Sequence, residues 1–264
     1  MKVNKFLLLG NDPKVQECKN RLISEGFIAD VTSGKEILSV LQDYDCIILP
    51  LPTISNGYIS GTVITIDEIL TNRRSDQYVF CGNIDLSAYS NCCSYYNDES
   101  FLIKNSQLTA QGVLKLILDT AEKSVYGLNA AVIGYGRCGK ITASLLKGVG
   151  MNVTVFSRRK ATITQAYFDG YISEDLNKLN QDINKYDVIV NTVPSNIITE
   201  DGVKKLSSNN IYIEVASKPY GFNINETDVH NFKYILGESL PGRFLPRSAG
   251  INIADTVIEI LKEV

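Results

Sequence analysis

The motif Gly-Tyr-Gly-Arg-Cys-Gly at residues 134–139 constrains the fold of this 264-residue chain more than any other feature. A G-x-G-x-x-G pattern alone is a weak signal, but here it directly follows the apolar run 130–133 and opens a helix-length stretch. In this order Gly134 permits a tight turn, Gly136 lets the backbone approach a pyrophosphate, and Gly139 lets the helix pack close to the sheet. The helix amides and dipole then face the phosphate charge. The motif predicts a dinucleotide-binding βαβ unit.

The residues that follow the second strand of this unit indicate which dinucleotide it binds. An NAD site usually places Asp or Glu there to hold the ribose hydroxyls. This chain instead has Ser157, Arg158 and Arg159 after the predicted strand 152–156. A carboxylate would repel a 2′-phosphate, whereas a hydroxyl and two guanidinium groups can bind it. The segment favours NADP(H) over NAD(H), with a solvated basic turn as the alternative.

A third wall of the predicted cofactor site follows the strand 187–191. The carboxyl ends of the strands in a Rossmann sheet line the crevice that holds the nicotinamide. Pro194 ends the strand pairing there and leaves backbone groups available, although an ordinary strand-ending turn is equally compatible. The predicted cofactor-binding residues are Gly134, Tyr135, Gly136, Arg137, Cys138, Gly139, Ser157, Arg158, Arg159, Thr192, Val193 and Pro194.

Short β-branched runs alternate with amphipathic helix-length stretches almost throughout the chain, a pattern typical of parallel sheets covered by helices. We therefore predict an α/β protein with two Rossmann-like domains, parallel sheets and a cleft between the domains, joined by a long helix at about residues 108–123. Residues 1–105 would form an N-terminal Rossmann- or flavodoxin-like substrate or partner domain. Residues 106–264 would form the NADP-binding domain, with a final helix, 249–263, that could also pack back on the N-terminal domain. The expected strands are 6–9, 27–31, 46–49, 78–81, 130–133, 152–156, 187–191, 211–215 and 233–236.

Charge and hydropathy exclude several classes of function. Lys and Arg number 26 against 29 Asp and Glu, a net charge of −3, which argues against nucleic acid or an anionic membrane as the main partner. No apolar run approaches the length of a membrane span, and the first residues lack the order of a signal peptide. We therefore expect a cytoplasmic protein.

The metal-binding residue types are sparse. The six cysteines show no C-x-x-C spacing, so we expect buried, reduced thiols rather than disulfides. Cys92 and Cys93 are adjacent, which leaves a redox switch or a metal site as an alternative, but no histidine accompanies them. The single histidine is His230, and a zinc site is not expected.

Two unusual segments, 214–221 and 240–250, follow the next strands of the predicted second domain. The second segment holds two arginines, Arg243 and Arg247, among two prolines and two glycines, which predicts a rigid, non-helical loop. Together with Lys218 these residues place three cations at the predicted nicotinamide crevice. Such convergence suits a small anionic substrate with more than one carboxylate. The alternative for each cation is an ordinary solvated side chain.

These segments resemble the dehydrogenase-like A subunits of dipicolinate synthase, a family of spore-forming bacteria. The resemblance extends over the whole chain and is most specific from residue 105 onward. Tyr220 departs from the family pattern, where a second glycine is usual, and Arg243 and Arg247 stand where lysines are common. The matching pieces are Asn105-Ser106, Thr109-Ala110, Gly112, VIGYGRCGK at 132–140, NTVP at 191–194, ASKP at 216–219 and LPGRFLPRSAG at 240–250.

The resemblance implies an NADP-linked oxidation of dihydrodipicolinate or hydroxytetrahydrodipicolinate to dipicolinate during sporulation. It also implies a partner, a second subunit that is flavoprotein-like, and a location in the mother cell; a homo-oligomer remains open. In this interpretation Arg243 and Arg247 bind the substrate carboxylates, and Lys218 polarises the ring or exchanges a proton with it. Ser217 and the backbone of Thr109-Ala110 would orient substrate and nicotinamide. The general acid or base is not identified, although Glu214 is a candidate.

Three other interpretations remain. A D-2-hydroxyacid dehydrogenase shares the two-domain plan but relies on a catalytic histidine, and His230 lies in an apparent surface turn. The glycine motif also resembles the cofactor domain of adenosylhomocysteine hydrolases, although the length and the missing acidic residue after the second strand argue against that class. A cofactor-binding regulatory or scaffold subunit without its own catalysis is the third.

Overall fold

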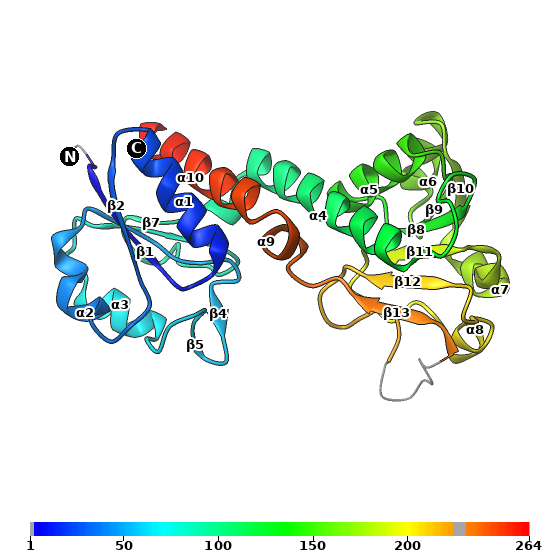
Figure 1. Cartoon of the computed structure of the whole chain (residues 1–264), viewed down its shortest axis with the longest axis horizontal. Coiled ribbons are helices and arrows are strands. Elements are labelled where there is room, and N and C mark those ends of the chain that lie inside the picture. The colour runs from blue at the N-terminus through cyan, green and yellow to red at the C-terminus, as the bar shows by residue number, and fades with distance from the viewer. Residues whose placement is uncertain (1–2, 224–230, 264) are drawn as a thin grey trace. The chain divides into compact units, whose positions relative to one another are not determined.

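The computed structural model describes residues 3–223 and 231–263. The chain divides into two compact units: unit 1 holds Met1–Asn105 and Pro241–Val264, and unit 2 holds Ser106–Leu240. The long helix α4 (Glu99–Thr120) passes from the first unit into the second (Figure 1). Each unit contains a parallel sheet, and the predicted α/β class is therefore confirmed.

Unit 1 is built on a five-stranded sheet in the order β2-β1-β3-β6-β7. Every neighbouring pair in this sheet is parallel, and the order is that of a flavodoxin-like doubly wound fold. A short antiparallel hairpin, β4-β5, follows β3. The elements are β1 (Lys5–Leu9), α1 (Pro13–Ser24), β2 (Ile28–Thr32), α2 (Ile37–Val40), η1 (Leu41–Asp43), β3 (Cys46–Ile48), β4 (Ile54–Ser55), β5 (Tyr58–Ile59), α3 (Ile66–Asn72), β6 (Tyr78–Cys81), β7 (Cys92–Ser94), η2 (Tyr95–Asn97) and the C-terminal α10 (Pro246–Glu263).

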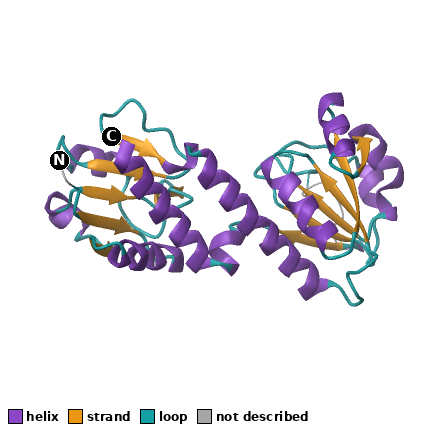
Figure 2. Ribbon diagram, turned by 90° about the horizontal axis from the view of Figure 1, so that it is seen from above, coloured by secondary structure: helices purple, strands orange, loops and turns teal. Residues whose placement is uncertain are grey.

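The first strand shows why this sheet is covered on both faces. Successive side chains of a strand point to opposite faces, and all four apolar residues of β1 are buried. Phe6 and Leu8 belong to one apolar cluster, together with residues of α1 and α10. Leu7 and Leu9 belong to the other, with residues of α2 and α3. Helices lie on both sides of the strands in Figure 2.

The C-terminal helix α10 packs beside α1, at the other end of the sequence (Figure 1). Asp255 of α10 pairs with Arg21 of α1 at 2.7 Å, and Val257 is fully buried between the helix and the sheet. Gly250 permits the close contact, because a Cβ there would lie 2.4 Å from the carbonyl oxygen of Lys14. The final helix thus completes the core of unit 1.

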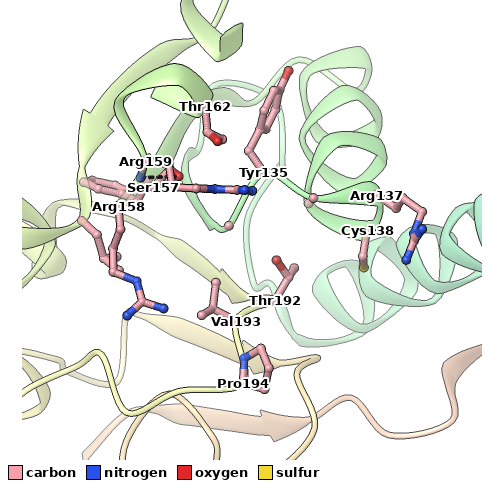
Figure 3. Close-up of a pocket in the computed structure, with 15 residues that line it drawn as sticks. Tyr135, Arg137, Cys138, Ser157, Arg158, Arg159, Thr162, Thr192, Val193 and Pro194 are labelled. Atoms are coloured by element: carbon pink, nitrogen blue, oxygen red, sulfur yellow. Dashed lines mark hydrogen bonds between the residues drawn. The ribbon is translucent and has the colours of Figure 1, made fainter. Parts of the chain in front are cut away.

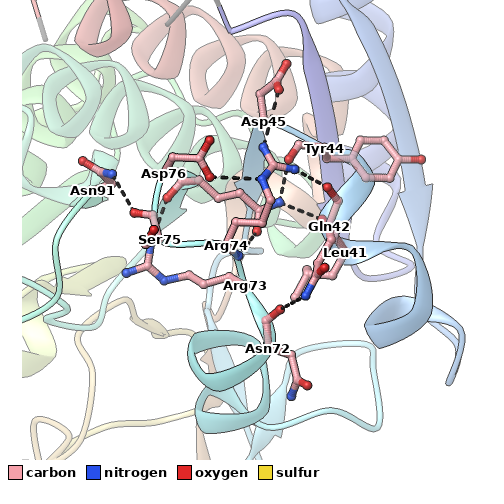
Figure 4. Close-up of polar contacts among 11 residues, drawn as sticks. Leu41, Gln42, Tyr44, Asp45, Asn72, Arg73, Arg74, Ser75, Asp76 and Asn91 are labelled. Atoms are coloured by element: carbon pink, nitrogen blue, oxygen red, sulfur yellow. Dashed lines mark hydrogen bonds and ion pairs between the residues drawn. The ribbon is translucent and has the colours of Figure 1, made fainter.

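A polar cluster ties β3 to β6 near their amino ends (Figure 4). Arg74 pairs with Asp76 at 3.0 Å and with Asp45 at 3.8 Å, and it also donates to the carbonyl of Gln42. The buried amide of Gln77 donates to the carbonyl of Leu41 at 2.7 Å. These contacts lie at the end of the strands opposite to that where Rossmann-like sheets bind ligands, so we interpret them as structural.

Unit 2 is built on a six-stranded parallel sheet in the order β10-β9-β8-β11-β12-β13. Counted from β8, this is the strand order 3-2-1-4-5-6 of a dinucleotide-binding Rossmann fold. Its elements after α4 are β8 (Asn129–Ile133), α5 (Arg137–Gly148), β9 (Asn152–Ser157), α6 (Lys160–Phe168), β10 (Ile172–Asp175), η3 (Leu176–Lys178), α7 (Leu179–Asp182), η4 (Ile183–Lys185), β11 (Val188–Asn191), α8 (Glu200–Lys204), β12 (Ile211–Glu214), β13 (Lys233–Leu236) and α9 (Leu240–Phe244), which ends in unit 1.

Two expectations about helices were wrong. Residues 240–250 are not a loop, because they form α9 and the start of α10. The prolines of this segment lie in the first turn of each helix, where the missing N–H costs no helical hydrogen bond. Helix α4 also begins at Glu99 rather than near residue 108, because the Asp98 carboxylate accepts the N–H of Phe101 at 2.6 Å.

The expectation of buried thiols holds only in part. All six cysteines are free, and Cys18, Cys46 and Cys81 are buried. Cys92 and Cys93 are half-buried because β7 is an edge strand, and Cys138 is half-buried in the first turn of α5. Among residues 3–223 and 231–263, no helix combines the length and apolarity that a membrane span requires.

Candidate functional site

The carboxyl ends of β8, β9 and β11 in unit 2 surround a cavity of about 580 Å³. This volume lies within the usual range of cofactor and ligand pockets. All the residues predicted to bind the cofactor line it (Figure 3). They come from three separate strand ends, which parallel pairing brings to one edge of the sheet. The sequence predicts a single site for the same reason.

The glycine turn after β8 has the geometry that the motif requires. Gly134 has a φ of +93°, a left-handed conformation that side chains disfavour. A Cβ there would also lie 2.5 Å from the hydroxyl of Thr192 and 2.8 Å from the side chain of Val193. The Gly134 N–H continues the sheet by donating to the carbonyl of Phe156 at 2.9 Å. The turn therefore brings β8 against the loop that follows β11.

The N-terminus of α5 offers the space and the charge that a phosphate group needs. Gly136 is the N-cap, with extended backbone and no side-chain cap, and a Cβ built on it meets no atom within 4 Å. The first-turn amides are therefore not capped by a side chain, and the helix dipole favours an anion in front of them. The residues present fit the pyrophosphate of a dinucleotide.

The opposite side of the cavity is basic (Figure 3). Ser157 ends β9 and is buried, whereas Arg158 and Arg159 are exposed around the cavity. The Ser157 hydroxyl accepts the N–H of Arg159 at 3.4 Å, which helps to fix this turn. Among the described residues that line the cavity, none is Asp or Glu.

The third wall is the turn after β11. Thr192 closes it against β8, because both its N–H and its hydroxyl donate to the carbonyl of Ile133, at 3.0 and 2.7 Å. The side chain of Asn191 bridges the N–H and the carbonyl of Val193, each at 3.0 Å. Pro194 follows and is exposed on the cavity rim.

Tyr135, the second residue of the motif, fixes the glycine turn to the end of α6. Its hydroxyl donates to the Asp169 carboxylate at 2.7 Å, and its ring contacts Tyr171 edge to face. The hydrogen bond from Tyr135 holds the pKa of Asp169 below its usual value, with help from Gln165. The ammonium of Lys140 lies 5.2 Å from the centre of the Tyr135 ring. Tyr135 thus has a positioning role that the sequence did not reveal.

Three lining residues were missed from the sequence: Phe156, Thr162 and Leu176. Phe156 precedes Ser157 in β9, and Thr162 lies in the first turn of α6, so both were within reach of a more detailed local reading. Leu176 follows the edge strand β10, which was not expected as a strand. Cys138 was predicted, and burial raises the pKa of its thiol, which makes it a weak nucleophile.

Ser217 and Lys218 lie in the loop after β12, and both are exposed. The Lys218 ammonium lies 5.9 Å from the centre of the Tyr220 ring, and the Tyr220 hydroxyl donates to Glu238 at 3.0 Å. Glu214, the candidate acid or base, is fully buried at the end of β12. Burial raises the pKa of Glu214, while hydrogen bonds from neighbouring groups oppose the rise.

Arg243 and Arg247 belong to unit 1, and both are exposed. Arg243 is in α9, with its guanidinium 4.7 Å from the centre of the Phe244 ring, and Arg247 is in the first turn of α10. Their convergence with Lys218 of unit 2 stays a prediction. The backbone of Thr109-Ala110 lies inside α4, where helical hydrogen bonds use the main-chain groups. His230 lies outside the described residues.

Comparison with known proteins agrees with this geometry. Residues 104–229 match the family model described as "D-isomer specific 2-hydroxyacid dehydrogenase, NAD binding domain". The match indicates a nicotinamide dinucleotide cofactor. It covers the glycine motif, the basic turn after β9 and the Lys218 loop.

The full-length similarity is to another group of proteins. The A subunit of dipicolinate synthase from Bacillus subtilis is 25% identical over 236 residues, covering 84% of this chain and 80% of that protein. The resemblance to the A subunits of dipicolinate synthase is confirmed. The crystal structure of this protein from Bacillus halodurans matches with a TM-score of 0.84 and 21% identity, over 99% of this chain and 98% of that one. The Bacillus subtilis structure matches with a TM-score of 0.82 and 23% identity, over 100% and 97%. These likenesses support an oxidoreductase-like role.

Proposed function

We propose that this chain is the A subunit of a dipicolinate synthase and oxidises dihydrodipicolinate or hydroxytetrahydrodipicolinate to dipicolinate with NADP⁺. The similarity to the dipicolinate synthase protein of Bacillus subtilis over 84% of the chain is the observation that carries this proposal. The bound nicotinamide would accept a hydride from the ring, and formation of the aromatic pyridine would supply the driving force. The protein then has to place the ring and bind its carboxylates.

The basic turn after β9 supports NADP(H) as the cofactor. Ser157, Arg158 and Arg159 line the cavity where a Rossmann fold binds the adenine ribose, and no carboxylate of the described lining residues would repel a 2′-phosphate. Arg158→Ala should therefore weaken NADPH binding about 10- to 100-fold and leave NADH binding nearly unchanged, since a charge-assisted hydrogen bond contributes about 1.5–3 kcal/mol. Lys185→Ala, a surface charge in an i,i+3 pair, is the matched control. An unchanged NADPH/NADH ratio in Arg158→Ala would refute the assignment.

The substrate roles follow from the chemistry of the exposed cations. Arg243 and Arg247 would bind the two carboxylates, because guanidinium groups match carboxylate geometry. Lys218 would polarise the ring or exchange a proton with it, and Ser217 would orient the substrate. A second, flavoprotein-like subunit is the proposed partner of the chain, in the mother cell of a sporulating bacterium.

The decisive experiment measures dipicolinate formation from freshly generated hydroxytetrahydrodipicolinate and NADP⁺, with and without the second subunit. Product that requires the chain, and that falls at least about tenfold in Lys218→Ala, supports the proposal; Lys178→Ala is the matched surface control. Product formed by the partner on its own would instead assign this chain to a regulatory or scaffold role. A parallel assay with 2-keto acids and NADH tests the hydroxyacid dehydrogenase alternative, which the family match of residues 104–229 keeps relevant.

A further inference from the structure

Glu214 is a fully buried carboxylate that accepts four hydrogen bonds from uncharged donors. One oxygen, Oε1, accepts the side-chain amide of Asn191 at 2.8 Å and the N–H of Ala216 at 3.2 Å. The other, Oε2, accepts the N–H of Gly221 at 2.8 Å and the hydroxyl of Tyr212 at 3.3 Å. A buried charge is tolerated only when its acceptor positions are filled in this way. The surrounding structure is therefore built around this carboxylate.

The two backbone donors mark the ends of a short exposed segment. Ala216 and Gly221 are buried, whereas Ser217, Lys218 and Pro219 between them are exposed. Glu214 thus holds both ends of the loop that carries Lys218. The Ala216 N–H is shared with the carbonyl of Asn191, also at 3.2 Å, while the Gly221 N–H has Glu214 as its acceptor.

The side-chain donor connects the same carboxylate to the cofactor cavity. Asn191 is fully buried, and its amide also binds the N–H and the carbonyl of Val193, a cavity-lining residue. Because the Asn191 Oδ1 accepts from Val193, the amide cannot flip without breaking that contact. One carboxylate therefore links the Lys218 loop to the wall formed by residues 192–194.

We propose that Glu214 is a positioning residue that fixes Lys218 relative to the cofactor cavity by binding both ends of the 216–221 loop and Asn191. The inference rests on the proposed role of Lys218 in turnover. Glu214 is fully buried and its oxygens are occupied, so it acts through the loop rather than on the substrate.

Glutamine cannot replace Glu214 in this arrangement. Its single oxygen can face either Gly221 and Tyr212 or Ala216 and Asn191, so its NH₂ group would point at the donors of the other pair. Tyr212 can rotate its hydroxyl to accept, but the backbone N–H groups can only donate. Glu214→Gln should therefore release at least one end of the loop.

Hydrogen exchange of the free protein tests the contact without any substrate. In the wild type, the amides of Ala216 and Gly221 should exchange slowly, and fast exchange of both would overturn the proposal. In Glu214→Gln, exchange should rise across residues 216–221 and stay unchanged across 134–140; uniform change throughout the unit would overturn the proposal, because it would indicate only a general loss of stability. Tyr212→Phe removes a donor outside the loop and is the control, for which loop exchange should hardly change.

A double-mutant cycle tests whether Glu214 acts through Lys218. We expect kcat/KM of Glu214→Gln to fall about 10- to 100-fold, and about twofold or less when Lys218 is already alanine. Equal falls in both backgrounds would overturn the proposal. If the wild-type complex forms no dipicolinate, the proposed function fails, while the exchange of Ala216 and Gly221 still decides whether the loop is held.

Discussion

Gly136→Ala should separate cofactor binding from folding. Gly136 has φ −81° and ψ −166°, which an alanine can adopt, and the added methyl group meets no atom within 4 Å. Alanine is a poorer N-cap than glycine, by about 1 kcal/mol, and it lowers the entropy of the unfolded chain by about 0.4–1 kcal/mol. The two effects oppose each other, so the free energy of unfolding should change by less than about 1 kcal/mol.

The same methyl group would occupy the space in front of the α5 amides. A phosphate pushed out of this position loses charge-assisted hydrogen bonds of about 1.5–3 kcal/mol each, so NADPH should bind at least about tenfold more weakly. Gly134→Ala should behave in the opposite way. Its φ of +93° and the 2.5 Å approach of the Thr192 hydroxyl predict a loss of at least about 1–3 kcal/mol in stability.

Urea unfolding without cofactor measures the stability of each variant, and titration with NADPH, followed by its fluorescence, measures affinity. Gly148→Ala is the matched control, because a Cβ at the end of α5 also meets no atom within 4 Å but lies away from the glycine turn. It should leave affinity unchanged. Wild-type NADPH affinity in Gly136→Ala would refute the assigned phosphate position, and a loss of stability as large as that of Gly134→Ala would refute the reasoning about open space.

Two further predictions concern contacts outside the glycine turn. Val257→Ala removes two methyl groups from a fully buried position of α10 and should lower the free energy of unfolding by about 1–3 kcal/mol in urea; wild-type stability would show that α10 contributes little to the core. Tyr135→Phe removes the hydroxyl that lowers the pKa of Asp169, so this pKa should rise toward about 3.9 in an NMR titration. Since a lowered carboxyl pKa stabilises the fold above that pH and is lost on acidification, the variant should also lose less stability as the pH falls below about 4; an unchanged Asp169 titration would contradict this.

The sequence by itself determined the architecture of the cofactor unit and the residues that line its cavity. The glycine motif, the apolar strand before it and the basic turn after β9 are each encoded within a few neighbouring residues. Parallel strands carry their carboxyl ends to one edge, so these local signals converge in any Rossmann fold. Order along the chain was therefore enough to group residues as distant as Gly134 and Pro194.

Only the tertiary structure decided the contacts between segments that no local pattern links. The sequence predicted a rigid loop at 240–250, but α9 and α10 form there, and burial of α10 against α1 stabilises a helix that prolines begin rather than break. The partners of Glu214 and Tyr135 were equally hidden, since Glu214 binds Asn191 and Tyr135 binds Asp169 across long stretches of chain. Such pairings depend on which polar groups are buried together and must satisfy each other, and that is known only once the chain has folded.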